Sequence, residues 1–126
     1  VGDLVLKEVA ERLQVAVRQE DTVARIGGDE FIVLLYGPKA ETDVAQVATR
    51  ILGKIEDPHY LSEKRLRVTA SIGIALFPQS AQDSQDLLRN ADFAMYLAKN
   101  DGGNRYLFYS KAYGKSLKNQ GPLKLV

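Results

Sequence analysis

Two acidic residues that directly follow two glycines, Gly27-Gly28-Asp29-Glu30, are the feature of this 126-residue chain that could do chemistry. Successive strand residues point to opposite faces, so Asp29 and Glu30 cannot both be buried cheaply unless a cation meets them. Carboxylate oxygens beside a turn without side chains suit a hard cation, and Mg²⁺ carrying a nucleotide phosphate fits such a site. The alternative from spacing alone is a solvent-exposed acidic turn.

The acids lie between two runs of β-prone residues, which predicts a hairpin. Residues 22–26 precede the glycines and residues 31–36 follow the acids. Glycine tolerates the positive φ that tight hairpin turns require. We therefore expect both carboxylates at the tip of a hairpin.

The remaining elements predict an α+β domain. Apolar residues recur at helical spacing from Leu6 to Val17, from Val44 to Ile55 and from Leu87 to Ala98. Residues 65–77 alternate as one long strand, and residues 106–109 form a short last strand. Short connections between these elements predict helices that cover a largely antiparallel central sheet.

The long strand has one face of small residues: Thr69, Ser71, Gly73 and Ala75. Its other face carries bulky side chains. A helix or a ligand must therefore come close to the small face.

The composition of the chain argues against several classes of function. The 17 basic and 16 acidic residues give a net charge of +1, which offers no electrostatic case for a nucleic acid polymer or an anionic membrane. There is no cysteine, one histidine and no apolar run of the ~20 residues that a membrane span needs. We expect a cytoplasmic domain over residues 1–110. Residues 111–126, with four lysines and no acid, are expected to be a tail or linker.

Four motifs in order resemble the GGDEF domains of diguanylate cyclases. Residues 25–31, Arg-Ile-Gly-Gly-Asp-Glu-Phe, contain the signature in all five positions. Gly2-Asp3-x-x-Leu6 is similar to the family's helix start, residues 68–75 to its long strand and residues 91–99 to its last helix. The resemblance implies a fold like that of nucleotide cyclases and polymerase palms. It also implies that the first strand, with a metal-binding Asp, would precede Val1.

The resemblance implies a reaction in which two GTP molecules condense into cyclic di-GMP with loss of two pyrophosphates. A homodimer would hold one GTP in each subunit. Mg²⁺, or Mn²⁺ in its place, would stabilise phosphate charge and activate the attacking hydroxyl. Asp29 would be a metal ligand and the general base, and Glu30 the second carboxylate. Gly27 and Gly28 would lie against the substrate, with the Gly28 N–H directed at the phosphates.

Two further substrate contacts follow from the resemblance. Asp3 would accept hydrogen bonds from guanine, and Lys99 would neutralise the triphosphate. Each has a structural alternative, because Asp3 stands where a helix cap could stand and Lys99 where a cation complements a helix dipole. The family commonly has Arg where Gly103 stands, although Arg105 lies two residues further on.

A second site follows from Arg18-x-x-Asp21, which fits the register of the family's product-inhibition motif. Arginine can grip a guanine edge or a phosphate with two hydrogen bonds, and Arg25 could add a contact. The alternative is an ion pair between Arg18 and Asp21 on a helix surface.

Three functions are therefore open. The first is a diguanylate cyclase domain with product inhibition. This chain alone is expected to be inactive, because it lacks the first strand that the resemblance implies. The parent protein would carry further domains, and a membrane anchor in it is compatible with this chain. The second, which Gly103 favours, is a non-catalytic GGDEF domain that binds GTP or cyclic di-GMP as a regulatory module. The third is an interaction domain with a merely structural hairpin.

Overall fold

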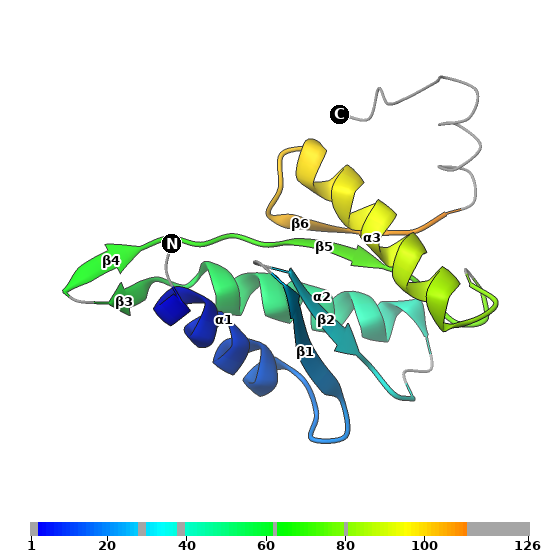
Figure 1. Ribbon diagram of the computed structural model, residues 1–126, viewed down its shortest axis with the longest axis horizontal. Coiled ribbons are helices and arrows are strands. Elements are labelled where there is room, and N and C mark those ends of the chain that lie inside the picture. Colours follow the sequence, from blue (N-terminus) through cyan, green and yellow to red (C-terminus); the bar gives the residue numbers. More distant parts are fainter. Residues whose placement is uncertain (1–2, 28–29, 38–39, 62, 80, 111–126) are drawn as a thin grey trace. The chain divides into compact units, whose positions relative to one another are not determined.

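The computed structural model describes residues 3–27, 30–37, 40–61, 63–79 and 81–110 (Figure 1). The elements in chain order are α1 (Asp3–Ala16), β1 (Thr22–Gly27), β2 (Glu30–Leu34), α2 (Glu41–Glu56), β3 (His59–Leu61), β4 (Lys64–Leu66), β5 (Ser71–Ile74), α3 (Ser84–Asn100) and β6 (Arg105–Phe108). They fall into a first unit, Val1–Thr69, and a second unit, Ala70–Val126, which we describe separately. The mixture of helices and strands confirms the predicted α+β class.

The predicted hairpin is present in the first unit. Strands β1 and β2 pair antiparallel, with Thr22 opposite Leu34 and Arg25 opposite Phe31. The register then shifts, so that Gly27 lies opposite Glu30. Strands β3 and β4 form a second antiparallel pair in the same unit.

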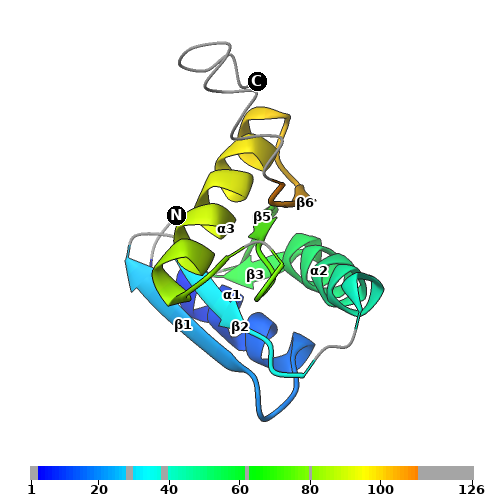
Figure 2. The ribbon, with the colours of Figure 1, turned by 90° about the vertical axis from the view of Figure 1, so that its right-hand side faces the viewer.

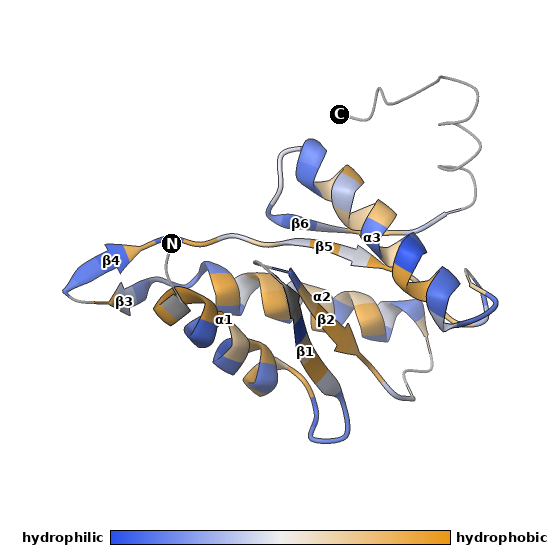
Figure 3. Ribbon diagram, in the orientation of Figure 1, coloured by the Kyte–Doolittle hydropathy of each residue, from blue (hydrophilic) through white to orange (hydrophobic). Residues whose placement is uncertain are grey.

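Helices α1 and α2 pack against each other in the core of the first unit. Each helix carries one apolar stripe, and Figure 3 shows hydrophobic and hydrophilic segments alternating along both. The buried members of the two stripes are Val5, Val9, Leu13 and Ala16 from α1, and Val44, Ala48, Ile51 and Ile55 from α2.

Arg12 of α1 forms hydrogen bonds with backbone atoms at the C-terminal end of α2. Its guanidinium donates hydrogen bonds to the carbonyl oxygens of Lys54 (2.7 Å), Asp57 (2.6 Å) and Pro58 (2.8 Å). It also donates to Glu8 Oε1 at 2.7 Å. The last carbonyls of a helix have no partner within the helix, so Arg12 supplies donors that α2 itself lacks.

The fully buried His59 lies beside this cluster. Its Nε2 atom is 2.8 Å from the carbonyl oxygen of Ile55. Its Nδ1 atom is 3.1 Å from Glu8 Oε1, close enough for an ion pair, yet it makes no hydrogen bond with any residue that the structure describes. His59 is thus a core residue that joins β3 to α1 and α2.

We predict that Arg12→Ala lowers the free energy of unfolding of the first unit by about 2–4 kcal/mol, because four charge-assisted hydrogen bonds, three of them partly buried, are lost. Urea unfolding followed by circular dichroism measures the change. Arg67→Ala is the matched control: the Arg67 side chain is 70% exposed and pairs with Glu56, so its loss is expected to change stability by less than about 1 kcal/mol. Equal effects of the two substitutions would contradict the assigned role of Arg12.

The second unit is built from a parallel pair covered by a helix. Ser71 lies opposite Arg105 and Ile74 opposite Phe108. Helix α3 packs on both strands (Figure 2). It begins after Asp83, whose carboxylate accepts a hydrogen bond from the backbone N–H of Asp86 at 2.8 Å.

Gly73 lies where β5 meets α3. A Cβ atom built on it would be 1.9 Å from the carbonyl oxygen of Ala91 and 2.2 Å from the backbone nitrogen of Met95. The helix backbone therefore occupies the space that a side chain would need. The close approach predicted for the small face is that of a helix.

The prediction of one continuous strand over residues 65–77 is wrong. The structure has the separate strands β4 and β5, and residues 67–70 between them belong to no strand. Alternation predicts an extended chain, but a strand also needs a hydrogen-bonded partner. Within the described residues, the strands pair two by two rather than in one continuous sheet.

Candidate functional site

The hairpin tip, Gly27–Glu30, joins β1 to β2. Gly27 is the last residue of β1 and Glu30 is the first residue of β2, and the Glu30 side chain is exposed. Gly28 and Asp29 lie outside the described residues. A carboxylate oxygen at an exposed strand end, opposite a residue without a side chain, suits a hard cation with a large ligand.

The pairing of β1 with β2 is irregular next to the tip. The register shift falls between Arg25 and Gly27, so β1 has one extra residue relative to β2. Such bulges increase the local twist and re-aim side chains, and they are common beside active sites. The rest of the hairpin is regular, and the side chains of Phe31 to Leu35 are half-buried.

Arg18 and Asp21 are brought together by the turn between α1 and β1. The Asp21 N–H donates to the Arg18 carbonyl oxygen at 3.0 Å, and the Arg18 N–H donates to Asp21 Oδ2 at 3.0 Å. The Arg18 side chain is 74% exposed, with Nη1 3.9 Å from Glu20 Oε2. Because α1 ends at Ala16, the alternative of a helix-surface ion pair between Arg18 and Asp21 is wrong.

Arg25 lies further along the same hairpin, on β1 opposite Phe31, and is exposed. It shares the first unit with Arg18 and Asp21. The structure thus places the three predicted inhibitory residues on one continuous segment, the turn and the strand that follows it.

Asp3 and Lys99 belong to different units. The Asp3 backbone lies in the first turn of α1, and the predicted role of its side chain stays a prediction. Lys99 is exposed in the last turn of α3. Nearby, the Arg105 guanidinium donates to Asp101 Oδ2 at 2.6 Å and to the Gly103 carbonyl oxygen at 3.1 Å. Arg105, which lies two residues after Gly103 and could supply the missing cation, is therefore already engaged.

No metal-binding cluster is complete within the described residues, where no three His, Cys, Asp or Glu side chains come together. Asp29 is not among these residues. Glu30, a hard oxygen donor at an exposed position, has the chemistry that Mg²⁺ or Mn²⁺ requires.

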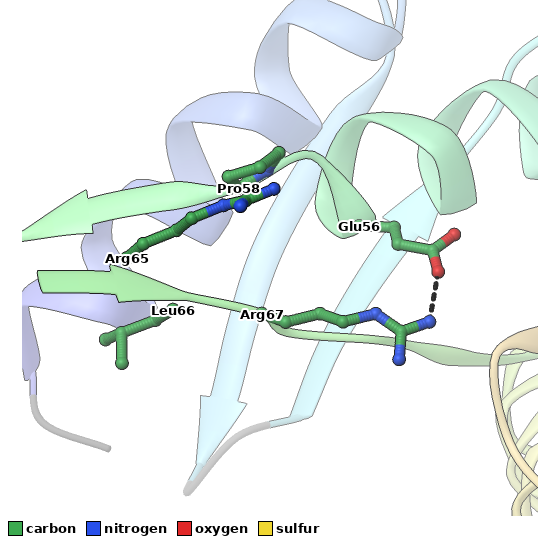
Figure 4. Close-up of a pocket in the computed structure, with 5 residues that line it drawn as sticks. All are labelled: Glu56, Pro58, Arg65, Leu66 and Arg67. Carbon is green, nitrogen blue, oxygen red and sulfur yellow. Dashed lines mark hydrogen bonds and ion pairs between the residues drawn. The ribbon is translucent and has the colours of Figure 1, made fainter.

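A cavity of about 330 Å³ lies in the first unit, beside the end of α2 (Figure 4). The described residues that line it are Glu56, Pro58, Arg65, Leu66 and Arg67. Arg67 pairs with Glu56, and none of the predicted site residues that the structure describes lines the cavity. No spacing pattern in the sequence signalled it, because it forms between a helix end and a hairpin.

None of the described helices has both the length and the apolar character to span a membrane.

Comparison with known proteins gives concordant results. The family model described as diguanylate cyclase, GGDEF domain, matches residues 1–105. The bifunctional diguanylate cyclase/cyclic di-GMP phosphodiesterase MucR of Pseudomonas aeruginosa is 42% identical over 120 residues, covering 95% of this chain and 17% of that protein. The chain therefore spans about a sixth of the length of this curated relative.

Solved structures agree with the fold. The GGDEF domain of the Pseudomonas aeruginosa protein named YfiN or TpbB has a TM-score of 0.82 and 37% identity, covering 86% of this chain and 68% of that chain. The GGDEF domain of DgcB from Caulobacter crescentus, solved in complex with c-di-GMP, has a TM-score of 0.72 and 25% identity, covering 84% of this chain and 63% of that chain.

Proposed function

The chain belongs to the diguanylate cyclase GGDEF domain family, and from this premise we propose that it condenses two GTP molecules into cyclic di-GMP. The observation that carries the proposal is the hairpin tip, which contains the family's Gly-Gly-Asp-Glu-Phe run. Gly27, the first residue of this run, is paired with Glu30, whose side chain is exposed. An acidic, glycine-rich tip on a bulged hairpin suits a metal-bound nucleotide better than a structural turn.

In this proposal the residues of the hairpin tip have different roles. Asp29 and Glu30 would hold Mg²⁺ or Mn²⁺, which supplies charge stabilisation to the phosphates when bound. Gly27 and Gly28 have no side chains, so the triphosphate would be able to lie against their backbone. Asp29 takes the proton of the 3′-hydroxyl of one GTP as that oxygen attacks the α-phosphorus of the other, and pyrophosphate leaves.

The partners follow from the same chemistry. A homodimer would bring together two GTP molecules, one from each subunit. Asp3 would read the guanine edge, and Lys99 would neutralise the triphosphate. We place the reaction in the cytoplasm, and we propose that further domains of a longer protein control it.

A second candidate is a regulatory domain that binds GTP or cyclic di-GMP without turnover. The observation that favours it is at the end of α3: Gly103 stands where the family commonly has Arg, and Arg105 already binds Asp101. A missing cation weakens the hold on the triphosphate.

Incubation of the natural-length protein with GTP and Mg²⁺ separates the two candidates. Chromatography should detect cyclic di-GMP and pyrophosphate if the cyclase proposal is right. Calorimetric binding of GTP without any product would instead favour the regulatory domain.

We also propose product inhibition at Arg18, Asp21 and Arg25, supported by the turn that joins the Arg18 backbone to Asp21 by hydrogen bonds and leaves the Arg18 side chain 74% exposed. Arg18→Ala is expected to raise the cyclic di-GMP concentration for half-inhibition by about tenfold or more, because a bidentate charged contact is lost. The measurement is the initial rate against added cyclic di-GMP. Arg67→Ala, which removes an exposed arginine elsewhere in the same unit, should leave the inhibition unchanged. An unchanged half-inhibition concentration for Arg18→Ala would refute the site.

A further inference from the structure

The carboxylate of Asp21 is occupied on both oxygens by backbone donors. Oδ2 accepts from the Arg18 N–H at 3.0 Å, and Oδ1 accepts from the Tyr36 N–H at 3.0 Å. We propose that Asp21 is a positioning residue, which clamps the open end of the β1–β2 hairpin and thereby fixes the geometry of the hairpin tip at the other end. Its effect on turnover rests on the proposed function.

The clamp continues the hairpin where the strand ladder stops. The last backbone pair is Thr22 with Leu34, and β2 ends there. Tyr36 lies two residues beyond Leu34, and its N–H is bonded to a side chain of the opposite segment. Asp21 therefore adds one further cross-strand connection, made by a carboxylate in place of a carbonyl.

Packing does not replace this connection. Tyr36 is 56% exposed, so burial of its side chain does little to hold its backbone. On the other segment, the reciprocal hydrogen bonds between Arg18 and Asp21 close a turn that fixes the carboxylate relative to the end of α1. One side chain thus joins the α1–β1 turn to the segment that follows β2.

The hairpin tip needs a constraint from this end. The register shift between Arg25 and Gly27 interrupts the regular pairing beside the tip. A slip of one residue would turn Glu30 to the opposite face, because side chains alternate along a strand. Two-stranded hairpins are only marginally stable alone, so a charge-assisted bond at the open end restrains the register along the whole ladder.

This role differs from ligand recognition. Each carboxylate oxygen has a second lone pair, so Asp21 can accept from a bound guanine while it still holds the backbone. A residue that served the ligand alone would influence only inhibition. A clamp also influences the tip in the free protein.

The first experiment uses Asp21→Asn in the absence of any nucleotide. The amide of asparagine can replace only one of the two acceptors. Amide hydrogen exchange of Tyr36 is expected to become about tenfold faster, because its charged acceptor is replaced either by the amide –NH2 group or by an uncharged oxygen. The amide resonances of Gly27 and Glu30 should also shift, although β1 separates them from Asp21 by roughly 20 Å.

Two controls keep the result interpretable. Unchanged exchange in α2 shows that Asp21→Asn is still folded. Glu20→Gln makes the matched change in the same turn, where the Glu20 side chain is 59% exposed and its ion-pair partner is the Arg18 guanidinium. It should alter neither the Tyr36 exchange nor the tip resonances.

The second experiment measures turnover without product. If the clamp positions the tip, Asp21→Asn lowers kcat by about tenfold and leaves KM for GTP within about twofold, as expected for lost transition-state alignment. Resonance shifts confined to residues 18–21 and 35–37, or an unchanged kcat, would overturn the proposal. If the unmodified protein makes no cyclic di-GMP, the proposed function fails, and the tip resonances alone decide the clamp.

Discussion

Replacing Gly73 with alanine is expected to destabilise the second unit by about 3 kcal/mol or more. The new methyl group would lie 1.9 Å from the Ala91 carbonyl oxygen and 2.8 Å from the Met95 Cα atom. Both are backbone atoms of α3, so no side-chain rotation relieves the overlap. The helix would have to move away from β5, which would open the contact that forms most of this unit.

Gly53→Ala is the matched control for that substitution. Gly53 lies inside α2, and a Cβ atom added there meets nothing within 4 Å. Alanine favours a helix over glycine by up to about 1 kcal/mol, so this variant should be as stable as the natural protein or slightly more stable. Urea unfolding, with hydrogen exchange to separate the two units, provides the comparison. A Gly73→Ala protein as stable as Gly53→Ala would show that α3 does not contact β5 as described.

Replacing Asp29 with asparagine is expected to reduce cyclic di-GMP synthesis by about a thousandfold or more. The substitution keeps the shape of the side chain and removes the negative charge that would hold the metal ion and accept the proton. The measurement is the initial rate of cyclic di-GMP formation at saturating GTP and Mg²⁺.

Asp57→Asn makes the same chemical change at an exposed acid that follows α2. Its carbonyl oxygen, not its side chain, is the atom that Arg12 contacts, so this variant should retain full activity. If Asp29→Asn and Asp57→Asn had similar rates, Asp29 would have no part in the reaction.

Local patterns in the sequence predict the elements of this fold well. The β-prone runs around Gly27-Gly28 predict the hairpin, and the lack of a side chain at Gly73 predicts a close approach. Both depend on residues near one another in the chain, whose spacing reports their geometry. The break between β4 and β5 could not be predicted in this way, because it depends on which segments pair.

The candidate site, too, can be predicted from local sequence patterns only in part. Its signature residues can be identified from their order alone, whereas the second role of Asp21 depends on Tyr36, 15 positions further on. Arg12 is a similar case, since its partners in α2 and beyond lie 42–46 positions away. Such hydrogen bonds join segments that no local pattern relates, so they appear only in the folded structure.

Titration calorimetry of the protein with GTP, with and without Mg²⁺, is the most direct test of the idea that the hairpin tip holds a metal-bound nucleotide. We predict saturable binding that requires Mg²⁺ and is lost in Asp29→Asn, while circular dichroism shows both proteins folded. A folded natural protein that takes up no GTP, or that binds it equally well without Mg²⁺ and without Asp29, would contradict the account.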